Sequence, residues 1–312
     1  MLDVTRLRVL VAVARHGSIT GAARALNYAQ PSISHHIARL EAETGAQLLQ
    51  RAGRGVQLTD AGRLLAERAA EIIGRLDAAE AELAAHVGGR EGRVRLAAFP
   101  SALAAIVPAA AARLEAQCPD LDLMVTEAEP PEALRMLRAG DVDVALVFRH
   151  YQQDADPGPP SAADEGTRGR LLLDEQVFLL TAAEGPAGAQ GLAAYAQCRW
   201  IAGCADCRGS LLQQCAAAGF TPKITFSTED CAAVQALVAA GLAVATLPGL
   251  ALRAAPHPGI RATALPGAGR KVFAMTYGDP PDPPASVRLI DILAQATRTD
   301  GPAPRTDGLA PS

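Results

Sequence analysis

The first 45 residues combine hydrophobic positions at helical spacing with turn signals, which predicts three short helices. His16-Gly17 ends the first helix, Ser18 is placed to cap the second, and the third runs from Gln30-Pro31 to Gly45. The apolar positions are Leu7, Leu10, Val11 and Ala14 in the first helix, Ala22, Ala23 and Leu26 in the second, and Ile33, Ile37 and Leu40 in the third. The alanines allow the second helix to approach the third closely, as a helix-turn-helix requires.

The opposite face of the third predicted helix carries short hydrogen-bonding side chains. Helical spacing places Gln30, Ser34, His35 and Arg39 away from the apolar stripe. Groups of this kind in the N-terminal half of a helix suit entry into a DNA major groove. The same pattern is compatible with a three-helix bundle whose polar face is only solvated, so two interpretations stay open.

Residues 48–59 predict a β-hairpin. Two short extended segments flank Arg54, which lies between Gly53 and Gly55. A hairpin with a cation at its tip presents that charge to DNA phosphates or to a minor groove, as a wing does. Thr59 is then placed to cap the next helix.

A long helix is predicted over residues 60–88, because no proline interrupts the segment and Gly88-Gly89 ends it. At roughly 1.5 Å per residue this helix would be ~40 Å long. Apolar residues recur every seven positions in two rows, which are Leu65, Ile72 and Ala79, and Ala69, Leu76 and Leu83. Such a seam predicts dimerisation through this helix, the alternative being that it packs against the body of its own chain.

After Gly92 short apolar segments alternate with helical ones, which predicts two α/β lobes. In the first lobe we expect strands at 94–99, 121–125 and 143–147 and helices at 102–117 and 131–138. In the second we expect strands at 176–181, 200–202, 223–226 and 243–245, and a return to the first lobe by a strand at 271–276 and a helix at 287–297. Two such lobes would enclose a cleft, and ligands gather beyond the carboxyl ends of such strands.

These patterns predict four parts of the chain. They are a DNA-binding module over 1–59, a linker helix over 60–88, an α/β body over 92–300 and a disordered tail over 300–312. Within the body, lobe I would comprise about 92–165 and 270–298, and lobe II about 170–265. The segment 152–169, rich in proline, glycine, alanine and aspartate, is predicted to be a flexible crossing loop.

The charge is distributed unevenly along a chain of ordinary globular composition. Hydrophobic residues make up 49% of the 312 residues and charged residues 20%, which is too apolar for a disordered protein. Seven arginines against four acidic residues give residues 1–60 a net charge of +3, whereas the whole chain carries −4 and the remainder therefore −7. A basic N-terminal block on an acidic body is typical of a polyanion-binding module joined to a ligand-binding one.

We expect a cytoplasmic protein with no membrane segment. Charged residues interrupt the apolar positions of the first 15 residues, unlike a signal peptide, and no apolar run approaches the roughly 20 residues that a membrane span needs. The six cysteines are then expected to be reduced.

Several stretches of the N-terminal module match one family pattern together. They are Gly17 to Leu26, Gln30 to Ile37, Leu40-Glu41, Gly45, and Arg51 through Leu58 to Gly62. With these motifs the sequence resembles the LysR-type transcriptional regulators, over nearly the whole chain. The resemblance implies an α+β multidomain fold: an N-terminal winged helix-turn-helix, a long dimeric linker helix, and a C-terminal two-lobed α/β effector-binding domain that is periplasmic-binding-protein-like.

The resemblance also implies which residues face DNA. Carried over by position, these are Gln30, Pro31, Ser34 and His35, with Arg51 and Arg54 on the wing, and helical spacing adds Arg39. Family members often have Phe where Leu49 stands and frequently Arg where His35 stands. The base preference is therefore left unassigned.

In such regulators an inducer lies between the two lobes. The matching positions here are Pro100, Ser101, Ala102, Glu129, Phe148, Arg149, Gly203, Thr228 and Leu247. Ser101 is a candidate for binding an anion at a helix N-terminus or for capping that helix. Arg149 is a candidate for clamping a carboxylate or for pairing with a local acid.

Five of the six cysteines lie between Cys198 and Cys231, and Cys204 and Cys207 form a CxxC motif. Three interpretations compete: a thiol sensor, a zinc site or ordinary small hydrophobes. The spacing does not match a zinc ribbon, which has two CxxC units, and we expect no metal. Cys207 and Cys215 lie near the switching cysteines of the peroxide-sensing branch of the family, and Arg208 is placed to lower the pKa of Cys207, but inert cysteines are the favoured interpretation.

The expected function is transcription regulation without enzymatic activity. The sequence contains no Walker A, GxSxG, GxGxxG or HExxH motif, and His150 and His257 have no evident nucleophile partner. The expected partners are an inverted-repeat operator in double-stranded DNA, a small-molecule effector and further copies of the chain as a homodimer or homotetramer, with RNA polymerase as a further candidate and no cofactor. The alternatives are a thiol-based sensor, a soluble ligand-binding protein, and an architectural DNA-binding protein whose effector lobes bind nothing.

Overall fold

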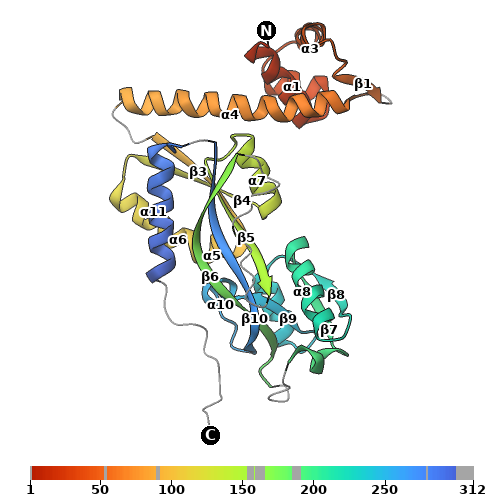
Figure 1. Cartoon of the computed structure of the whole chain (residues 1–312), viewed down its shortest axis with the longest axis vertical. Helices are drawn as coiled ribbons and strands as arrows, with labels where there is room; N and C mark the ends of the chain where they lie inside the picture. The colour runs from red at the N-terminus through yellow and green to blue at the C-terminus, as the bar shows by residue number, and fades with distance from the viewer. Residues whose placement is uncertain are drawn as a thin grey trace. The chain divides into compact units, whose positions relative to one another are not determined.

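The computed structural model describes residues 2–52, 55–88, 92–152, 158, 166–184, 191–278 and 280–299 (Figure 1). The chain divides into two compact units. Met1–Gly89 and Arg135–Asp141 form the first, and Arg90–Leu134 and Val142–Ser312 form the second. Among the described residues, no helix is both long enough and apolar enough to cross a membrane.

The N-terminal unit is a winged helix-turn-helix followed by a long helix. Its elements are α1 (Val4–His16), α2 (Ile19–Ala25), α3 (Gln30–Thr44), the antiparallel hairpin of β1 (Leu49–Ala52) and β2 (Gly55–Leu58), and α4 (Asp60–Gly88). Gly17 and Gly45 end α1 and α3 with φ values of 63° and 68°, a conformation that glycine adopts at little cost. Leu10, Ile33 and Leu40 lie fully buried in one core. The predicted winged helix-turn-helix is confirmed.

Contacts between α3, the hairpin and α4 fix the start of the wing. The Oε1 atom of Glu41, in α3, accepts hydrogen bonds from the N–H groups of Leu48 at 2.8 Å and Leu49 at 3.1 Å. The hydroxyl of Thr59 donates to the Gln47 carbonyl at 2.7 Å and accepts from the N–H of Gly62 at 3.0 Å, so Thr59 caps α4. A Cβ at Gly62 would lie 2.1 Å from the Leu48 carbonyl oxygen, so only glycine fits there.

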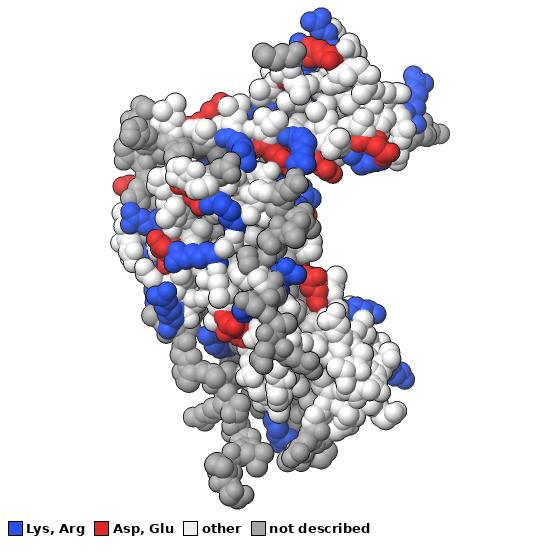
Figure 2. Space-filling model, viewed as in Figure 1, with Lys and Arg blue, Asp and Glu red and all other residues white. Residues whose placement is uncertain are grey.

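One face of α4 packs on the helix-turn-helix core. Ala66, Ala69 and Ile73 are buried in that core, and Arg8 of α1 pairs with Asp77 of α4. On the face shown in Figure 2, acidic and basic side chains lie interspersed along α4. The first half of α4 is thus held by its own unit.

The second unit is built on one mixed six-stranded sheet. Its strands are β3 (Gly92–Ala98), β4 (Leu121–Glu127), β5 (Val144–Gln152), β6 (Thr167–Ala182), β9 (Ala245–Pro248) and β10 (Ile260–Tyr277), in the order β4-β3-β5-β10-β6-β9. Strand β3 is parallel to β4 and β5, whereas β10 is antiparallel to β5 and β6. A second, parallel sheet pairs β7 (Arg199–Ala202) with β8 (Lys223–Ser227).

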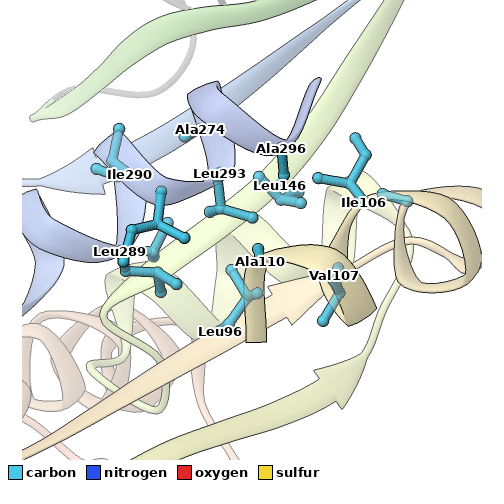
Figure 3. Packing of buried hydrophobic residues seen from close by; sticks show 14 of the residues in the cluster. Leu96, Ile106, Val107, Ala110, Leu146, Ala274, Leu289, Ile290, Leu293 and Ala296 are labelled. Atoms are coloured by element: carbon cyan, nitrogen blue, oxygen red, sulfur yellow. The ribbon is translucent and has the colours of Figure 1, made fainter. Parts of the chain in front are cut away.

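Helices cover these sheets. They are α5 (Pro100–Ala105), α6 (Val107–Gln117), α7 (Pro130–Arg138), α8 (Ala205–Ala217), α9 (Cys231–Ala239), α10 (Gly249–Ala254) and α11 (Pro284–Thr299), with a short 3-10 helix η1 (Leu192–Tyr195). Figure 3 shows Leu289 and Leu293 of α11 pointing at Leu96 of β3, Leu146 of β5 and Ala110 of α6, in the largest core of the unit. Each buried aliphatic side chain of this kind contributes about 1.5–3 kcal/mol.

The predicted two-lobed α/β class is confirmed, but three expected elements differ. The helix predicted over 102–117 is interrupted at Ile106, because Pro108 cannot donate the hydrogen bond that a continuous helix needs. The strands predicted at 176–181 and 271–276 are only parts of β6 and β10, which pair with each other along almost their whole lengths.

The predicted crossing loop 152–169 is strand at both ends, since β5 reaches Gln152 and β6 begins at Thr167. Residues 153–157 and 159–165, and the predicted tail 300–312, lie outside the described residues. The lobes are therefore joined by two long paired strands, and groups facing each other on β5, β6 and β10 meet where the lobes join.

Candidate functional site

The predicted DNA-facing side chains lie together on the outer face of α3. Gln30, Pro31, Ser34, His35 and Arg39 are all exposed, while the opposite stripe of the helix is buried. The Ser34 hydroxyl lies 3.4 Å from the Gln30 carbonyl and donates to it. The N-terminal half of α3 thus presents a row of hydrogen-bonding groups to solvent.

The wing adds one described cation to this surface. Arg51 is exposed on β1, whereas Arg54 lies outside the described residues. Sequence reasoning missed Tyr28, which is 42% exposed in the turn before α3 and stacks on His36 with ring centroids 5.9 Å apart. It also missed the role of Glu41, which no local pattern reveals because its hydrogen-bond partners lie in the following hairpin.

The predicted seam of α4 divides into a covered half and an open half. Leu65 and Ala69 pack in the helix-turn-helix core. Ile72, Leu76 and Leu83 are 49%, 38% and 64% exposed, and Ala79 between them is exposed as well. Spacings of four, three and four residues place these four side chains in one stripe. A single copy of the chain leaves this stripe in water.

A cleft lies in the second unit where its lobes join. Its walls come from both lobes and enclose about 680 Å³ of empty space, including the part open to solvent. The polar and charged residues that line it are Ser101, Glu129, His150, Ser210, Gln214, Thr228, Glu229, Thr246 and Arg270. Apolar lining comes from Phe99, Phe148, Val177, Ile201, Val234 and Leu247. The cleft has the volume and composition of a small-molecule site.

Arg270 of β10 lies at the centre of the cleft wall. Its Nε donates to Oε1 of Glu175 at 2.6 Å, and its Nη2 donates to the Ser101 hydroxyl at 2.8 Å. Its guanidinium carbon lies 4.8 Å from the ring centre of Phe99 and 4.6 Å from that of Phe148, which favours cation–π interaction. This buried charge is therefore paired and packed from several sides.

Strand register brings these groups together. Arg270 lies opposite Glu175 on β6 and opposite His150 on β5. The second carboxylate oxygen of Glu175 accepts the N–H of Leu250 at 2.6 Å, in the first turn of α10. Sequence reasoning missed Arg270 and Glu175 because residues far apart in the chain become neighbours only when β6 and β10 pair.

Several polar atoms in the cleft wall have no hydrogen-bond partner. They are Oε2 of Glu129, both ring nitrogens of His150 and Oε1 of Gln214. Burial, with a smaller contribution from the charge of Arg270, lowers the pKa of His150 to about 4, so this imidazole is neutral near pH 7. Burial raises the pKa of Glu129, and the nearby Glu229 raises it further.

Seven of the nine predicted effector positions line this cleft. They are Pro100, Ser101, Glu129, Phe148, Gly203, Thr228 and Leu247. Ala102 instead packs in the core beneath α5. Arg149 is exposed and does not line the cleft, because side chains alternate along β5 and its neighbours Phe148 and His150 take the cleft side. Arg270 supplies the cleft cation in its place.

The two roles considered for Ser101 are both replaced. Phe99 is the N-cap residue of α5, without a side-chain hydrogen bond, so Ser101 does not cap that helix. The Ser101 side chain is buried and its hydroxyl accepts from Arg270 rather than standing free for an anion.

The cysteines divide into two environments. Cys204, Cys207 and Cys231 line the cleft, and the sulfur atoms of Cys204 and Cys207 lie 3.1 Å apart at the start of α8. Their hydrogen bond lowers the pKa of Cys204 and raises that of Cys207, so the expected activation of Cys207 by Arg208 is wrong. Cys215 is fully buried in a separate core, where burial raises its pKa to about 11. Within the described part of the chain, no group of three or more His, Cys, Asp or Glu side chains is placed to hold a metal ion.

Comparison with known proteins matches both units to one family. The family model described as "Bacterial regulatory helix-turn-helix protein, lysR family" matches residues 4–63, and the model described as "LysR substrate binding domain" matches residues 88–298. The probable HTH-type transcriptional regulator LrrA of Synechococcus elongatus is 28% identical over 253 residues, which is 80% of this chain and 82% of LrrA. The nitrogen assimilation regulatory protein nac of Escherichia coli is 29% identical over 252 residues, 79% of this chain and 78% of nac.

Two solved structures share the fold over nearly the whole chain. The crystal structure of CbnR, a LysR family transcriptional regulator, gives a TM-score of 0.64 at 20% identity and covers 95% of this chain and 99% of CbnR. Full-length OxyR from Pseudomonas aeruginosa gives a TM-score of 0.67 at 20% identity and covers 99% of both chains.

Proposed function

Because the chain belongs to the LysR family of bacterial transcriptional regulators, we propose that it binds an inverted-repeat operator through α3 and the wing, under control of a small molecule in the cleft. The observation that carries the DNA-binding part is the exposed row from Gln30 to Arg39 on a helix whose other face is buried. A helix held this way presents its polar face as a rigid unit, which reading a major groove requires. A related fold, CbnR, has been crystallised with its target DNA.

The open stripe of α4 supports a dimer as the DNA-binding species. A long apolar stripe at heptad spacing is stabilised by a second copy of the same helix. A two-fold dimer presents two α3 helices, which fits an operator made of two half-sites. A tetramer would pair two such dimers on neighbouring sites, and contact with RNA polymerase would couple the bound protein to transcription.

The cleft supports the control by a small molecule. Its lining comes from both lobes, so a ligand that contacts both stabilises a closed arrangement of them. A ligand shifts the population of DNA-binding states only to the extent that it binds one arrangement better than the other. We propose a non-enzymatic role, in the cytoplasm, since the similar curated proteins named above are regulators.

Selection of DNA by the purified full-length protein tests this function. Genomic fragments are incubated with the protein, recovered and sequenced, and the enriched fragments are footprinted. We expect enrichment of sites with a two-fold symmetric motif, protected over two half-sites. Recovery of fragments without any shared motif would overturn the proposed operator binding and would favour an architectural DNA-binding protein.

A further inference from the structure

The cleft contains more acidic than basic charge. Its charged lining residues are Glu129, Glu229 and Arg270. The charge of Arg270 is already neutralised by Glu175, which is not itself among the lining residues, and both side chains are almost completely buried. The Nη2 group of Arg270 is also occupied, by the Ser101 hydroxyl. An anionic ligand would therefore find the cation paired and two further carboxyl groups close by.

The cleft wall also holds buried acceptor atoms that lack a donor. The carboxyl of Glu129 interacts with the Cys204 thiol, yet its Oε2 atom is buried without a hydrogen-bond partner. Gln214 is 7% exposed, and its Nε2 donates to the Ser210 hydroxyl at 3.0 Å while its Oε1 has no donor. Buried acceptors are normally satisfied in proteins, by the protein itself, by water or by a ligand. Both atoms would be satisfied by a ligand that brings N–H groups.

Resting on the proposed function, we infer that the effector is a small organic cation, with an ammonium or amidinium group bound by Glu129 and an apolar body. The ammonium or amidinium supplies the N–H donors that Glu129 and Gln214 lack, and it compensates the acidic excess. The apolar lining of the cleft, which includes Val177, Ile201 and Leu247, then contacts the body of the ligand. Burial and Glu229 both raise the pKa of Glu129, and a bound cation opposes both effects.

Matched pairs of cations and anions test this inference on the full-length protein. The pairs are benzamidine with benzoate, isobutylamine with isobutyrate, and putrescine with succinate. Thermal unfolding is recorded with each compound, and calorimetry gives the affinity of any compound that raises the Tm. We expect at least one cation to raise the Tm while its acid partner does not.

Two variants locate the binding. Glu129→Gln keeps the shape of the side chain and removes its charge, and should weaken binding of the active cation about tenfold or more. Glu127→Gln makes the same change two residues earlier, on the exposed edge of β4 outside the cleft, and should leave the affinity unchanged. Retained DNA selection by both variants shows that they are folded.

Three results would overturn the inference. They are tighter binding of the acid partners, equal binding of a cation by Glu129→Gln and the native protein, and no Tm increase with any of the three cations. None of these affects the DNA selection, so the proposed operator binding stands or falls separately. Tight binding of an acid would retain the cleft as the effector site and change only the class of ligand.

Discussion

The outer face of α3 and the cleft both depend on polar side chains, but in opposite surroundings. On α3 the polar groups are exposed, carry no buried charge and rest on a buried stripe such as Ile33 and Leu40. In the cleft the charge of Arg270 is buried and paired with Glu175, and neighbouring acceptors lack donors. A solvated face exchanges water for DNA at little cost in protein stability. The cleft instead couples ligand binding to the stability of the fold.

The largest expected effect comes from breaking the buried ion pair. Arg270→Met leaves the carboxylate of Glu175 buried without its cation, and removal of one member of such a pair costs about 3–5 kcal/mol. We expect chemical denaturation to show a loss of this size, and the double variant Arg270→Met with Glu175→Gln to recover part of it. Arg149→Met, an exposed change on neighbouring β5, is the control. A loss below about 1 kcal/mol would show that the pair contributes no more than a surface ion pair.

His150 makes the stability of the cleft depend on pH. Its folded-state pKa of about 4 lies below its ordinary value of 6.5, so between these values the unfolded chain binds a proton that the folded protein does not. The free energy of unfolding should therefore fall as the pH drops from 6.5 to 4, by about 3 kcal/mol.

Denaturation at several pH values tests this dependence. His150→Phe should flatten the pH profile in this window, whereas His16→Gln, at an exposed position, should not. Glu129 contributes in the opposite direction, since its pKa is raised, but it is present in all three proteins. An unchanged profile in His150→Phe would show that His150 titrates normally in the folded protein.

The open stripe of α4 predicts the next largest effect. Leu76→Lys removes two leucines from a two-fold seam, at about 1.5 kcal/mol each, which corresponds to a ~100-fold rise in the dimer dissociation constant. Sedimentation equilibrium measures this change. Leu64→Lys, at a 60% exposed position outside the seam, should leave the dissociation constant unchanged. Equal dimerisation of both variants would place the interface elsewhere.

Substitutions on the DNA-facing surface should separate base preference from general affinity. Gln30→Ala should relax the sequence preference, at about 1–3 kcal/mol for the preferred site, while Arg51→Ala should weaken all sequences alike and reduce the salt dependence. Arg54→Ala should act like Arg51→Ala. Titrations against matched and mismatched operators at several salt concentrations distinguish the two patterns, with Gln213→Ala and Arg93→Ala as exposed controls in the other unit. A uniform loss of affinity in both variants would remove Gln30 from the groove.

The cysteines carry the smallest expected effect. Cys207 and Cys215 lie eight residues apart on α8, roughly 12 Å along the helix axis, which exceeds the reach of a disulfide. The pKa values of both thiols are raised, which keeps them protonated. Operator binding should therefore respond to peroxide neither in the native protein nor in the Cys204→Ser, Cys207→Ser, Cys215→Ser variant. A peroxide-dependent footprint that the variant loses would establish a thiol sensor.

The two regions differ in how much of them could be predicted. The surface of α3 was predictable because its spacing, its N-terminal proline and its terminal glycine act within 15 residues of one another. The cleft was predictable only at turns that follow strands, such as Ser101 and Glu129. Arg149 was expected in the cleft and Arg270 was not, because both lie in strands where a single step in register exchanges the two faces.

By itself the sequence determined the winged helix-turn-helix, the long helix with its seam and the two-lobed class of the body, since each depends on local periodicity and turns. Only the tertiary structure decided that β6 and β10 run through both lobes and bring His150, Glu175 and Arg270 to one register. It also decided which half of the α4 seam its own core covers. The physical reason is the same in both cases: pairing between segments far apart in the chain is selected by the whole packed core, and local patterns do not record it.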